Sequence, residues 1–538
     1  MKPLIILKGS RVAEIDSICI KNGIDSKWLM NNAGKSVSKV ILEDFKSTKV
    51  KQQFKGVVVC GGGNNGGDGF VAAIDLIKSG MNICVFYVHP TEKFSKDSKF
   101  YFDKLAKLKN ANVKYLDFEN EKEKTDFIKK VGNADFVVDA IFGTGLHGKD
   151  IYCQSKEIID CINYIKSCQK EKSRNLLIYS VDIPSGIDSD NAKVLGSSIK
   201  ADKTITFGCK KLGNVCYPGR QFCGIVEVFD IGIPEKYFQQ YEQIFEANIC
   251  WVAIKIPLKE AWTYKHAVGK LLIIAGSIGY TGAASMTCKS ALRAGAGIVT
   301  LVCPWELNNI FEVKLTEVMT YPVEQTDDIS IHMDAFEEIR ELAGKFDALA
   351  IGPGLSKNPS TICLVREILK QIKKPTVLDA DGLRALYGPM EIERENSFDL
   401  THVVITPHSG ELAAILGREK IALEERLEAN LEVVKKYNLV SVLKGASTLI
   451  TDQQQMTFIN PTGSWALATA GTGDILTGII GSFLAQGMGL MEAAVCGTFI
   501  HGYASDIMAC KTSRTSQIAT DLIEGLKQTF LEIERIKY

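Results

Sequence analysis

The stretch Val57-Val58-Val59-Cys60-Gly61-Gly62-Gly63-Asn64-Asn65-Gly66-Gly67-Asp68-Gly69 sets the fold of the first half of the chain. An apolar, β-branched run leads directly into a glycine-rich turn, which is typical of a buried parallel strand followed by a helix. In the second half, Ala470-Gly471-Thr472-Gly473-Asp474 opens the apolar stretch from Ile475 to Leu484. Glycines at such junctions expose backbone N–H groups, and a helix N-terminus attracts phosphate. The two loops therefore predict two anion-binding clefts, as in two enzymes joined end to end.

Composition excludes several classes of protein. The chain has 538 residues, which predicts more than one domain. Lys+Arg and Asp+Glu both number 63, and this balance argues against a nucleic-acid partner. Fifteen cysteines without a Cys-x-x-Cys motif favour reduced thiols and a cytoplasmic protein. The apolar segment from Ile475 to Ile500 contains Gln486 and Glu492, so it predicts two packed helices and no membrane partner. A homo-oligomer is compatible with this composition.

Two series of short apolar strands alternate with helical patterns. The first series is Val57–Cys60, Ile83–Val88, Phe136–Asp139, Leu176–Asp182, Thr204–Phe207 and Ile225–Asp230. The second series is Leu271–Ala275, Ile298–Val302, Ala348–Ile351, Thr376–Asp379, Val403–Thr406 and Val440–Leu443. Strands that are apolar on both faces predict parallel sheets covered by helices. We therefore expect an α/β protein of two three-layer α/β/α domains, residues 1–245 and 246–538.

Two further segments carry predictions of their own. The segment from about Ala247 to Thr263 has weak periodicity and is predicted to join the two domains. The Lys-rich tract from Glu92 to Lys130 mixes both signs of charge, so it predicts a solvated helical face and not a binding patch.

Polar turns follow three strands of the first half. These turns are Asn64–Asp68, Asp139–Gly145 and Asp182–Asp188. In an open α/β sheet, ligands bind where such strand ends converge. Asp182 is a candidate base at a strand end. The oxygens that suit a hard cation such as potassium are those of Asn65, Asp139 and Ser185. The first glycine loop lacks the Gly-x-Gly-x-x-Gly context of redox dinucleotide enzymes.

Together these motifs match a family. Leu29–Gly34, Gly63–Gly69, Val138–Gly145 and Val181–Gly186 resemble the YjeF N-terminal family, the NAD(P)H-hydrate epimerases with a Rossmann-like domain. The resemblance covers residues 11–235 and implies a potassium ion on the three oxygens named above. It also implies contacts to the hydrated nicotinamide nucleotide from Asn64, Asn65, Gly66, Gly67, Asp68, Gly143, Thr144, Gly145, Leu146, His147, Gly148, Lys149 and Asp182. The alternative is a nucleotide-binding module without catalysis.

The second glycine loop predicts phosphoryl transfer. Backbone N–H groups of Gly471–Gly473 are expected to face a phosphate, and Asp474 to take a proton from the hydroxyl being phosphorylated. The alternative is a plain helix start capped by Thr472. Lys444 at a strand end is a candidate contact for nucleotide phosphate. His408 lies in a turn between proline and glycine, where a core histidine is not expected.

The second half resembles the ribokinase-like superfamily. Within it, Gly276–Ala284, Ala291–Gly297 and Thr406–Glu411 resemble the YjeF C-terminal family, the NAD(P)H-hydrate dehydratases, from about Lys265 onward. The resemblance implies that Ala283, Gly354, His408 and Asp474 contact the hydrated nucleotide. It implies an adenine nucleotide on Lys444, Gly445, Ala446, Ser447, Thr448 and Gly473, and the fused order of domains favours ADP with Mg²⁺.

The combined hypothesis is repair of hydrated NADH and NADPH. The first half would interconvert the R and S hydrates, and the second half would dehydrate the S hydrate at the expense of ADP. The alternative is a ribokinase-like kinase of a small alcohol fused to a nucleotide-binding module.

Overall fold

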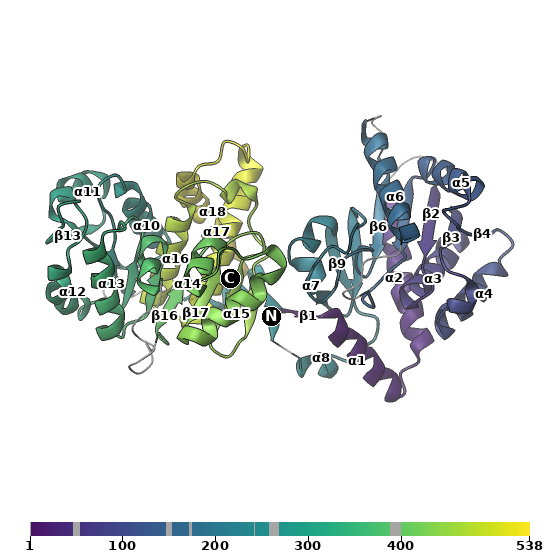
Figure 1. Cartoon of the computed structure of the whole chain (residues 1–538), viewed down its shortest axis with the longest axis horizontal. Coiled ribbons are helices and arrows are strands. Elements are labelled where there is room, and N and C mark those ends of the chain that lie inside the picture. The colour runs from purple at the N-terminus through teal and green to yellow at the C-terminus, as the bar shows by residue number, and fades with distance from the viewer. Residues whose placement is uncertain are drawn as a thin grey trace. The chain divides into compact units, whose positions relative to one another are not determined.

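Two compact units make up this protein in a computed structural model, which describes residues 2–46, 54–146, 153–171, 175–241, 243–257, 268–387 and 400–537. The N-terminal unit is Ile5–Glu242, and the C-terminal unit is Gln243–Tyr538 together with Met1–Leu4. Each unit has a largely parallel sheet with helices on both of its faces (Figure 1). The predicted α/β class is confirmed.

The N-terminal unit is built on a seven-stranded parallel sheet in the order β4-β3-β2-β5-β6-β7-β9, and β1 pairs with β8 beside it. Its strands are β1 (Leu4–Leu7), β2 (Lys55–Cys60), β3 (Asn82–Tyr87), β4 (Asn112–Tyr115), β5 (Phe136–Ala140), β6 (Leu177–Val181), β7 (Lys203–Phe207), β8 (Lys210–Lys211) and β9 (Ile225–Phe229). Its helices are α1 (Gly9–Lys21), α2 (Ser26–Lys46), α3 (Asn64–Lys78), α4 (Lys96–Ala106), α5 (Glu121–Gly132), α6 (Cys153–Glu171), α7 (Leu212–Val215) and α8 (Lys236–Gln239).

Strand order reverses between β2 and β5, which are neighbours in the middle of this sheet. Val58 of β2 pairs with Val85 of β3 on one side and with Val138 of β5 on the other. The chain leaves the carboxyl ends of β2 and β5 toward opposite flanks of the sheet, which opens a crevice between the two loops. The fold thus places the first glycine loop beside the loop that follows β5.

Helices cover this sheet on both faces because its central strands are apolar on both faces. Val58 packs in one core cluster with Leu29 of α2 and Phe70 of α3. Val59 points to the opposite face and packs in a second cluster with Phe127 of α5. Alternate residues of one strand therefore build two cores, as expected for a buried parallel strand.

The C-terminal unit has strands in the order β13-β12-β11-β14-β15-β16-β17-β18-β19-β10. Its strands are β10 (Ile244–Glu246), β11 (Lys270–Ile274), β12 (Ile298–Pro304), β13 (Met319–Val323), β14 (Ala348–Ile351), β15 (Thr376–Leu378), β16 (Val403–Ile405), β17 (Val440–Leu443), β18 (Leu449–Thr451) and β19 (Thr457–Ile459). Its helices are α9 (Ile249–Lys255), α10 (Thr281–Arg293), α11 (Asn308–Lys314), α12 (Phe336–Ala343), α13 (Pro359–Gln371), α14 (Ser409–Leu416), α15 (Arg426–Tyr437), α16 (Thr472–Ala485), α17 (Leu490–Lys511) and α18 (Ala519–Lys537).

Pairing in this sheet is parallel except where β18 meets β17 and β19. Here too the strand order reverses at two central neighbours, β11 and β14. The loops after these two strands contain Tyr280 and Gly354, and a Cβ built on Gly354 would lie 2.6 Å from Cβ of Tyr280. A side chain at residue 354 would therefore push these two loops apart, and its φ of 64° also favours glycine.

All twelve predicted strands are present, within one or two residues at each end. Seven strands were not predicted from the sequence: β1, β4, β8, β10, β13, β18 and β19. Most of these lie at sheet edges or are only two to four residues long, so they lack the long apolar run that marks a central strand. Polar residues in β4, such as Asn112 and Lys114, are tolerated because β4 is an edge strand.

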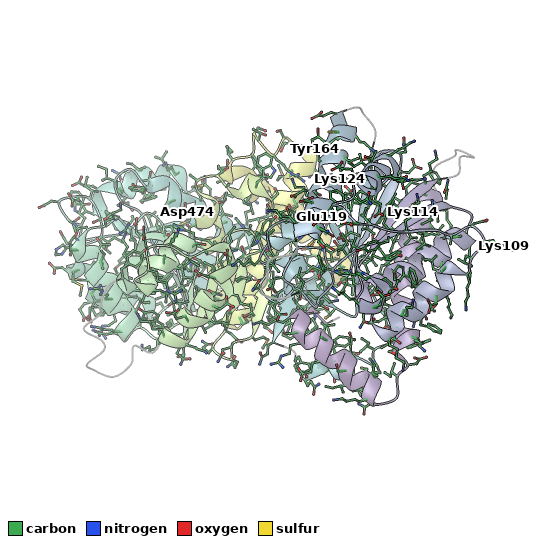
Figure 2. The ribbon with its side chains drawn as sticks, turned by 45° about the vertical axis from the view of Figure 1, so that its right-hand side comes forward. Lys109, Lys114, Glu119, Lys124, Tyr164 and Asp474 are labelled. Atoms are coloured by element: carbon green, nitrogen blue, oxygen red, sulfur yellow. The ribbon has the colours of Figure 1, made fainter. Side chains whose placement is uncertain are left out.

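Two predicted segments differ in detail. The expected join contains α9, whose start is capped by Asn248 accepting the N–H of Trp251 at 2.9 Å. The Lys-rich tract is not one helical face, because it contains α4, β4 and α5. Lys114 forms an ion pair with Asp126 at 2.6 Å, whereas Lys109 and Glu119 are exposed (Figure 2).

The late apolar segment forms α16 and α17, as predicted. The two helices pack closely, since a Cβ on Gly497 of α17 would lie 2.7 Å from Cγ1 of Ile480 in α16. Within the described residues, none of the helices combines the length and the apolar character needed to cross a bilayer.

Candidate active sites

A cavity of about 670 Å³ lies at the carboxyl ends of β2, β5 and β6 in the N-terminal unit. Its wall is formed by α1, the first turn of α3, the loop after β5 and two charged residues of the β6–β8 region, Asp182 and Lys211. The predicted residues that line it are Asn64, Asn65, Asp68, Gly143, Thr144, Gly145, Leu146 and Asp182. Three turns far apart in the sequence therefore meet at one site.

Two predicted glycines pack inside the protein instead. A Cβ on Gly66 would lie 1.9 Å from the carbonyl oxygen of Gly61, and one on Gly67 would lie 2.5 Å from Sδ of Met30. Neither is among the lining residues. Both allow α3 to start close to its neighbours, and their contact with a substrate stays a prediction. The predicted residues His147, Gly148 and Lys149 lie outside the described residues.

Asp182 is held in a fixed charge pair. Lys211, which is completely buried, donates to its Oδ1 at 2.5 Å. The same oxygen accepts the hydroxyl of Thr206 at 2.9 Å and the N–H of Phe207 at 3.3 Å. Lys211 also donates to the Thr206 hydroxyl and the Phe207 carbonyl, each at 2.9 Å. The backbone at Asp182 has a left-handed conformation, with φ 65°, which is strained for a residue other than glycine. The hydrogen bonds from Lys211, Thr206 and Phe207 compensate this strain.

The three residues predicted to hold potassium meet around the carbonyl of Phe142. Asn65 donates its Nδ2 to this oxygen at 2.9 Å, and Ser185 Oγ lies 3.3 Å from it. Ser185 also donates to Oδ1 of Asp139 at 2.5 Å. Asp139 is completely buried, and burial raises the pKa of its carboxyl while hydrogen bonds from Ser185 and Ser180 lower it. A carboxylate, a hydroxyl and carbonyl oxygens fit a hard cation.

Two more carboxyls face this cavity. Asp16 of α1 was not predicted, and Asp68 of α3 was. Burial, together with the nearby Asp182, raises the pKa of Asp16 to about 6, although Lys211 opposes the shift. Burial and the charges of Asp182 and Asp16 raise the pKa of Asp68 well above its usual value. Lys93 also lines the cavity, so part of the Lys-rich tract does contribute to it.

The C-terminal unit has a cavity of about 410 Å³, lined by Tyr280, Ala283, Gly354, Ala380, Asp381, Arg384, Tyr387, His408, Gly410, Glu411 and Asp474. The four residues predicted to contact the hydrated nucleotide are all among them. The predicted nucleotide residues, Lys444–Thr448 and Gly473, lie next to this cavity and not on its wall. They are joined to it where Lys444 N–H donates to the Pro407 carbonyl at 2.8 Å, beside His408.

Asp474 lies in the first turn of α16, labelled in Figure 2. Within the described residues, its carboxylate accepts no hydrogen bond, and no carbonyl accepts the N–H of Gly473 or Asp474. Thr472 does not cap the helix, because its hydroxyl bonds back to the carbonyls of Leu467 and Thr469, each at 3.0 Å. Burial and Asp379 raise the pKa of Asp474 to about 7. The helix start therefore offers donors and a proton acceptor together.

Lys444 forms an ion pair close to the N-terminus of α16. Its Nζ donates to Oδ1 of Asp379 at 2.6 Å, and Thr477 of α16 donates to the other oxygen at 2.6 Å. Burial alone would lower the pKa of the Lys444 ammonium. The carboxylates of Asp379 and Glu411 outweigh it, so the pKa is raised above its usual value. A Cβ on Gly473 would lie 3.3 Å from this Nζ. The predicted lysine and the predicted glycine are thus neighbours.

Arg426, which was not predicted, organises the loop after β17. Its guanidinium donates to the carbonyls of Leu443 at 3.0 Å, Lys444 at 3.1 Å and, more closely, Ala446. The loop carries positive φ at Gly445 (135°) and Ser447 (52°). A loop whose carbonyls turn inward presents its N–H groups outward, which is the geometry of an anion-binding nest. The sequence gives no local signal, because Arg426 lies 18 residues before Lys444.

His408 is the N-terminal cap of α14. Its Nδ1 accepts the N–H groups of Gly410 at 3.0 Å and Glu411 at 3.3 Å, and Glu411 accepts the His408 N–H at 2.8 Å. The ring is 61% exposed, so its other edge faces the cavity and solvent. The expectation that this is no core histidine is confirmed.

Comparisons with known proteins agree with both halves. A family model described as YjeF-related protein N-terminus matches residues 26–213, and one described as NAD(P)H-hydrate dehydratase matches residues 271–528. The bifunctional NAD(P)H-hydrate repair enzyme of Moorella thermoacetica is 36% identical over 515 residues, covering 95% of this chain and 93% of that one. The enzyme of the same name from Thermofilum pendens is 34% identical over 511 residues, covering 94% and 92%.

A solved structure is similar to the second half. It is the ADP/ATP-dependent NAD(P)H-hydrate dehydratase of Bacillus subtilis, co-crystallised with ATP and Mg²⁺, and is 26% identical with a TM-score of 0.44. The likeness covers 53% of this chain and 97% of that one. The family is established by the two repair enzymes from Moorella thermoacetica and Thermofilum pendens, which are 36% and 34% identical to this chain over almost their whole length. This chain belongs to the family of bifunctional NAD(P)H-hydrate repair enzymes.

Proposed function

We propose that this chain repairs hydrated NADH and NADPH with two active sites, in domains of residues 1–245 and 246–538. The N-terminal unit exchanges the R and S hydrates, and the C-terminal unit dehydrates the S hydrate with ADP. The observation that carries the proposal is Asp474, a carboxylate without a hydrogen-bond partner among the described residues, which faces a cavity from the start of α16. A cytoplasmic location belongs to the same proposal.

Dehydration begins with transfer of phosphate to the ring hydroxyl. Asp474 takes the hydroxyl proton while the oxygen attacks the terminal phosphorus, and AMP leaves. The resulting phosphate ester then loses phosphate from the ring carbon, and loss of a proton from the adjacent carbon restores the ring double bond. The N–H groups of Gly473 and Asp474 stabilise the charge that develops on the phosphoryl oxygens. Lys444, beside Gly473, adds a positive charge to the same place.

The nucleotide is proposed to lie on the loop after β17. Arg426 holds the carbonyls of Leu443, Lys444 and Ala446. The Lys444 amide is bonded to the Pro407 carbonyl, so the amides of Gly445 and Ala446 are proposed to bind the phosphate. Asp381 and Glu411 are the carboxylates on the cavity wall that could support magnesium with the nucleotide phosphates. When bound, magnesium supplies neutralisation of the phosphate charge.

In the N-terminal unit, the hydrated ring is proposed to lie in the 670 Å³ cavity. The loop Gly143–Leu146 and the start of α3 provide backbone groups for its phosphates. Potassium is proposed to bind the oxygens of Asn65, Asp139 and Ser185. Two observations support this: the Asn65 amide and the Ser185 hydroxyl both lie beside the Phe142 carbonyl, and Ser185 also contacts Asp139. When bound, it supplies a positive charge close to the glycine loops. Replacing K⁺ by a larger organic cation is expected to weaken epimer exchange.

The test is an absorbance assay of the full chain with hydrated NADH, run in parallel with ADP and with ATP. Restored NADH absorbs at its own wavelength, so a rise in absorbance that needs nucleotide supports dehydration. A stable phosphorylated product without this rise would instead support a kinase of a small alcohol. A faster rise with ATP than with ADP would correct the choice of nucleotide but not the reaction.

A further inference from the structure

The N-terminal cavity contains more ionisable groups than substrate binding requires. Asp16, Asp68, Asp182 and Lys211 all line it, from α1, α3, the loop after β6 and β8. They interact electrostatically, because Asp182 and Lys211 act on both Asp16 and Asp68, and Asp16 acts on Asp68. Three carboxyls around one ammonium cannot all be ionised cheaply in a half-buried site. The arrangement therefore retains a proton.

Asp182 differs from the other two carboxyls in its hydrogen bonds. Its Oδ1 accepts the Lys211 ammonium at 2.5 Å, the Thr206 hydroxyl and the Phe207 N–H. Three donors on one oxygen, one of them cationic, stabilise the ionised carboxylate. Asp182 and Lys211 are thus a fixed pair of opposite charges. A group that must gain and lose a proton in each turnover is poorly served by such contacts.

Asp16 and Asp68 are in the opposite situation. Neither carboxyl has a hydrogen bond from any residue in the described ranges, and both face the cavity. Their surroundings include the apolar side chains of Val12, Leu29 and Met30. Burial is the main cause that raises the pKa of each carboxyl. Asp182 and Lys211 act on both carboxyls, Cys19 lies near Asp16, and Cys60 and Tyr101 lie near Asp68. The same cavity wall also carries His89, Lys93 and Asp97.

We infer that Asp16 and Asp68 are the acid–base pair of epimer exchange, and that they share one proton beside the fixed Asp182–Lys211 pair. This inference rests on the proposed epimerase function and names the residues that move its proton. Both carboxyls line the same cavity, and the charge of Asp16 disfavours ionisation of Asp68, so one proton shared between them is the arrangement we infer.

The chemistry balances without any further reactant. The protonated carboxyl donates its proton to the hydroxyl of the hydrated ring, and the C–O bond breaks as water leaves with the electron pair. The ring nitrogen contributes its lone pair and forms a C=N⁺ bond. Water then adds to the opposite face, the nitrogen regains its lone pair, and the added water gives a proton to the ionised carboxyl. The pair ends with one proton, as it began, and nothing is oxidised or reduced.

Charge in the cavity suits this route. The C=N⁺ intermediate is a cation. The pair has given up its proton by then, so both of its carboxylates stabilise the cation, together with Asp182. Lys211 keeps the net charge from becoming too negative in the empty site. Two carboxyls from different helices, α1 and α3, provide one proton donor and one acceptor in each direction of the reaction.

The test compares Asp16→Asn in the full chain with Glu14→Gln. Glu14 is the matched control, since it lies on the same helix, is exposed and, among the described residues, pairs with Arg11 and Tyr241. Exchange between chromatographically separated hydrates is measured without nucleotide, so that dehydration cannot consume them. Dehydration of the S hydrate with ADP then reports on folding of the same sample.

We expect Asp16→Asn to slow exchange by about 100-fold or more and to leave dehydration unchanged. The wild-type exchange rate is expected to depend on pH with two limbs, and Asp16→Asn to keep only one, because one carboxyl then titrates alone. Asp16→Glu retains a carboxyl and is expected to recover part of the rate. Glu14→Gln is expected to behave as wild type.

Exchange by Asp16→Asn within threefold of wild type, with both limbs intact, would overturn the inference. If Asp16→Asn instead loses both activities, Asp16→Glu decides: partial exchange with full dehydration supports the pair, and loss of both activities again contradicts it. A wild-type chain that does not exchange the hydrates at all would refute the proposed function, which is a different result.

Discussion

Both cavities use a lysine paired with an aspartate, but they use the pair differently. Lys211 is completely buried and gives hydrogen bonds to Asp182, Thr206 and Phe207. Among the described residues, the Lys444 ammonium has one such partner, Asp379, and its side chain stays 21% exposed. The first ammonium is saturated by the protein, whereas the second keeps donors for a ligand. Lys211 can therefore only hold Asp182 in place, whereas Lys444 can also bind an anion such as the phosphate of the proposed reaction.

The largest expected effect separates the two sites at Asp474. Asp474→Asn removes the proton acceptor and keeps the shape of the α16 start, so we expect dehydration to fall by about 10²- to 10⁴-fold. Exchange is expected to stay at the wild-type rate, because it belongs to the other cavity. Both rates are measured on one preparation. Equal loss of both activities would contradict two independent sites.

The two lysines are expected to differ in what their loss does to dehydration. Lys211→Met leaves Asp182 buried without its cation, and breaking such a pair costs about 3–5 kcal/mol of unfolding free energy. Lys444→Met leaves Asp379, whose side chain is 1% exposed, in the same situation, and it is expected to impair dehydration as well. Urea unfolding and the dehydration rate are measured on both variants. Dehydration at the wild-type rate by folded Lys444→Met would remove the distinction between a saturated and a ligand-ready lysine.

The pH dependence of dehydration follows from Asp474. Its pKa is raised to about 7, and a base works only when ionised. The dehydration rate is therefore expected to fall roughly tenfold for each pH unit below 7 and to level off above it. The dehydration rate at saturating ADP is measured in buffers from about pH 5.5 to about pH 8.5. A flat profile there would mean that another group takes the proton.

Acid should weaken the C-terminal unit through His501. Burial lowers the pKa of this histidine to about 4, while its Nε2 contacts the Thr472 carbonyl at 2.9 Å. The unfolded chain binds this proton more readily, so stability is present above about pH 6.5 and is lost as pH falls toward 4. We expect a loss of about 2 kcal/mol between pH 7 and pH 5. His501→Gln should lose less over the same interval, as measured by urea unfolding at each pH.

The smallest expected effect concerns the loop after β17, on which the nucleotide is proposed to lie. Arg426→Lys removes the fork that holds the carbonyls of Leu443, Lys444 and Ala446. We expect the KM for ADP to rise about tenfold with little change in kcat, since about 1.4 kcal/mol of binding free energy corresponds to a factor of ten. An unchanged KM, with the variant folded, would show that the loop keeps its shape without the arginine.

The sequence predicted the central strands and the glycine turns because both have local signals. Val57–Cys60 is apolar on both faces, and the Gly61–Gly69 turn follows it directly. Edge strands were missed, since β4 (Asn112–Tyr115) carries polar side chains into solvent. For the same reason, the Lys-rich tract that contains β4 was predicted to form one helical face.

The charged pairs could not be predicted in the same way. Lys211 meets Asp182 across 29 residues, and Lys444 meets Asp379 across 65. Asp16 reaches the cavity from α1, and nothing adjacent to it in the sequence marks it as functional. Only the tertiary fold brings these groups together, because strand order and not sequence distance decides which loops share a crevice.

The most direct test of the account is the yield of reduced nicotinamide from an equal mixture of R and S hydrates with excess ADP. We expect the full chain to convert the whole mixture, because exchange feeds the remaining hydrate to the dehydrating site. Asp16→Asn should stop near half on the same time scale. A full chain that itself stops at half, or that accumulates a stable phosphate ester, would contradict the account.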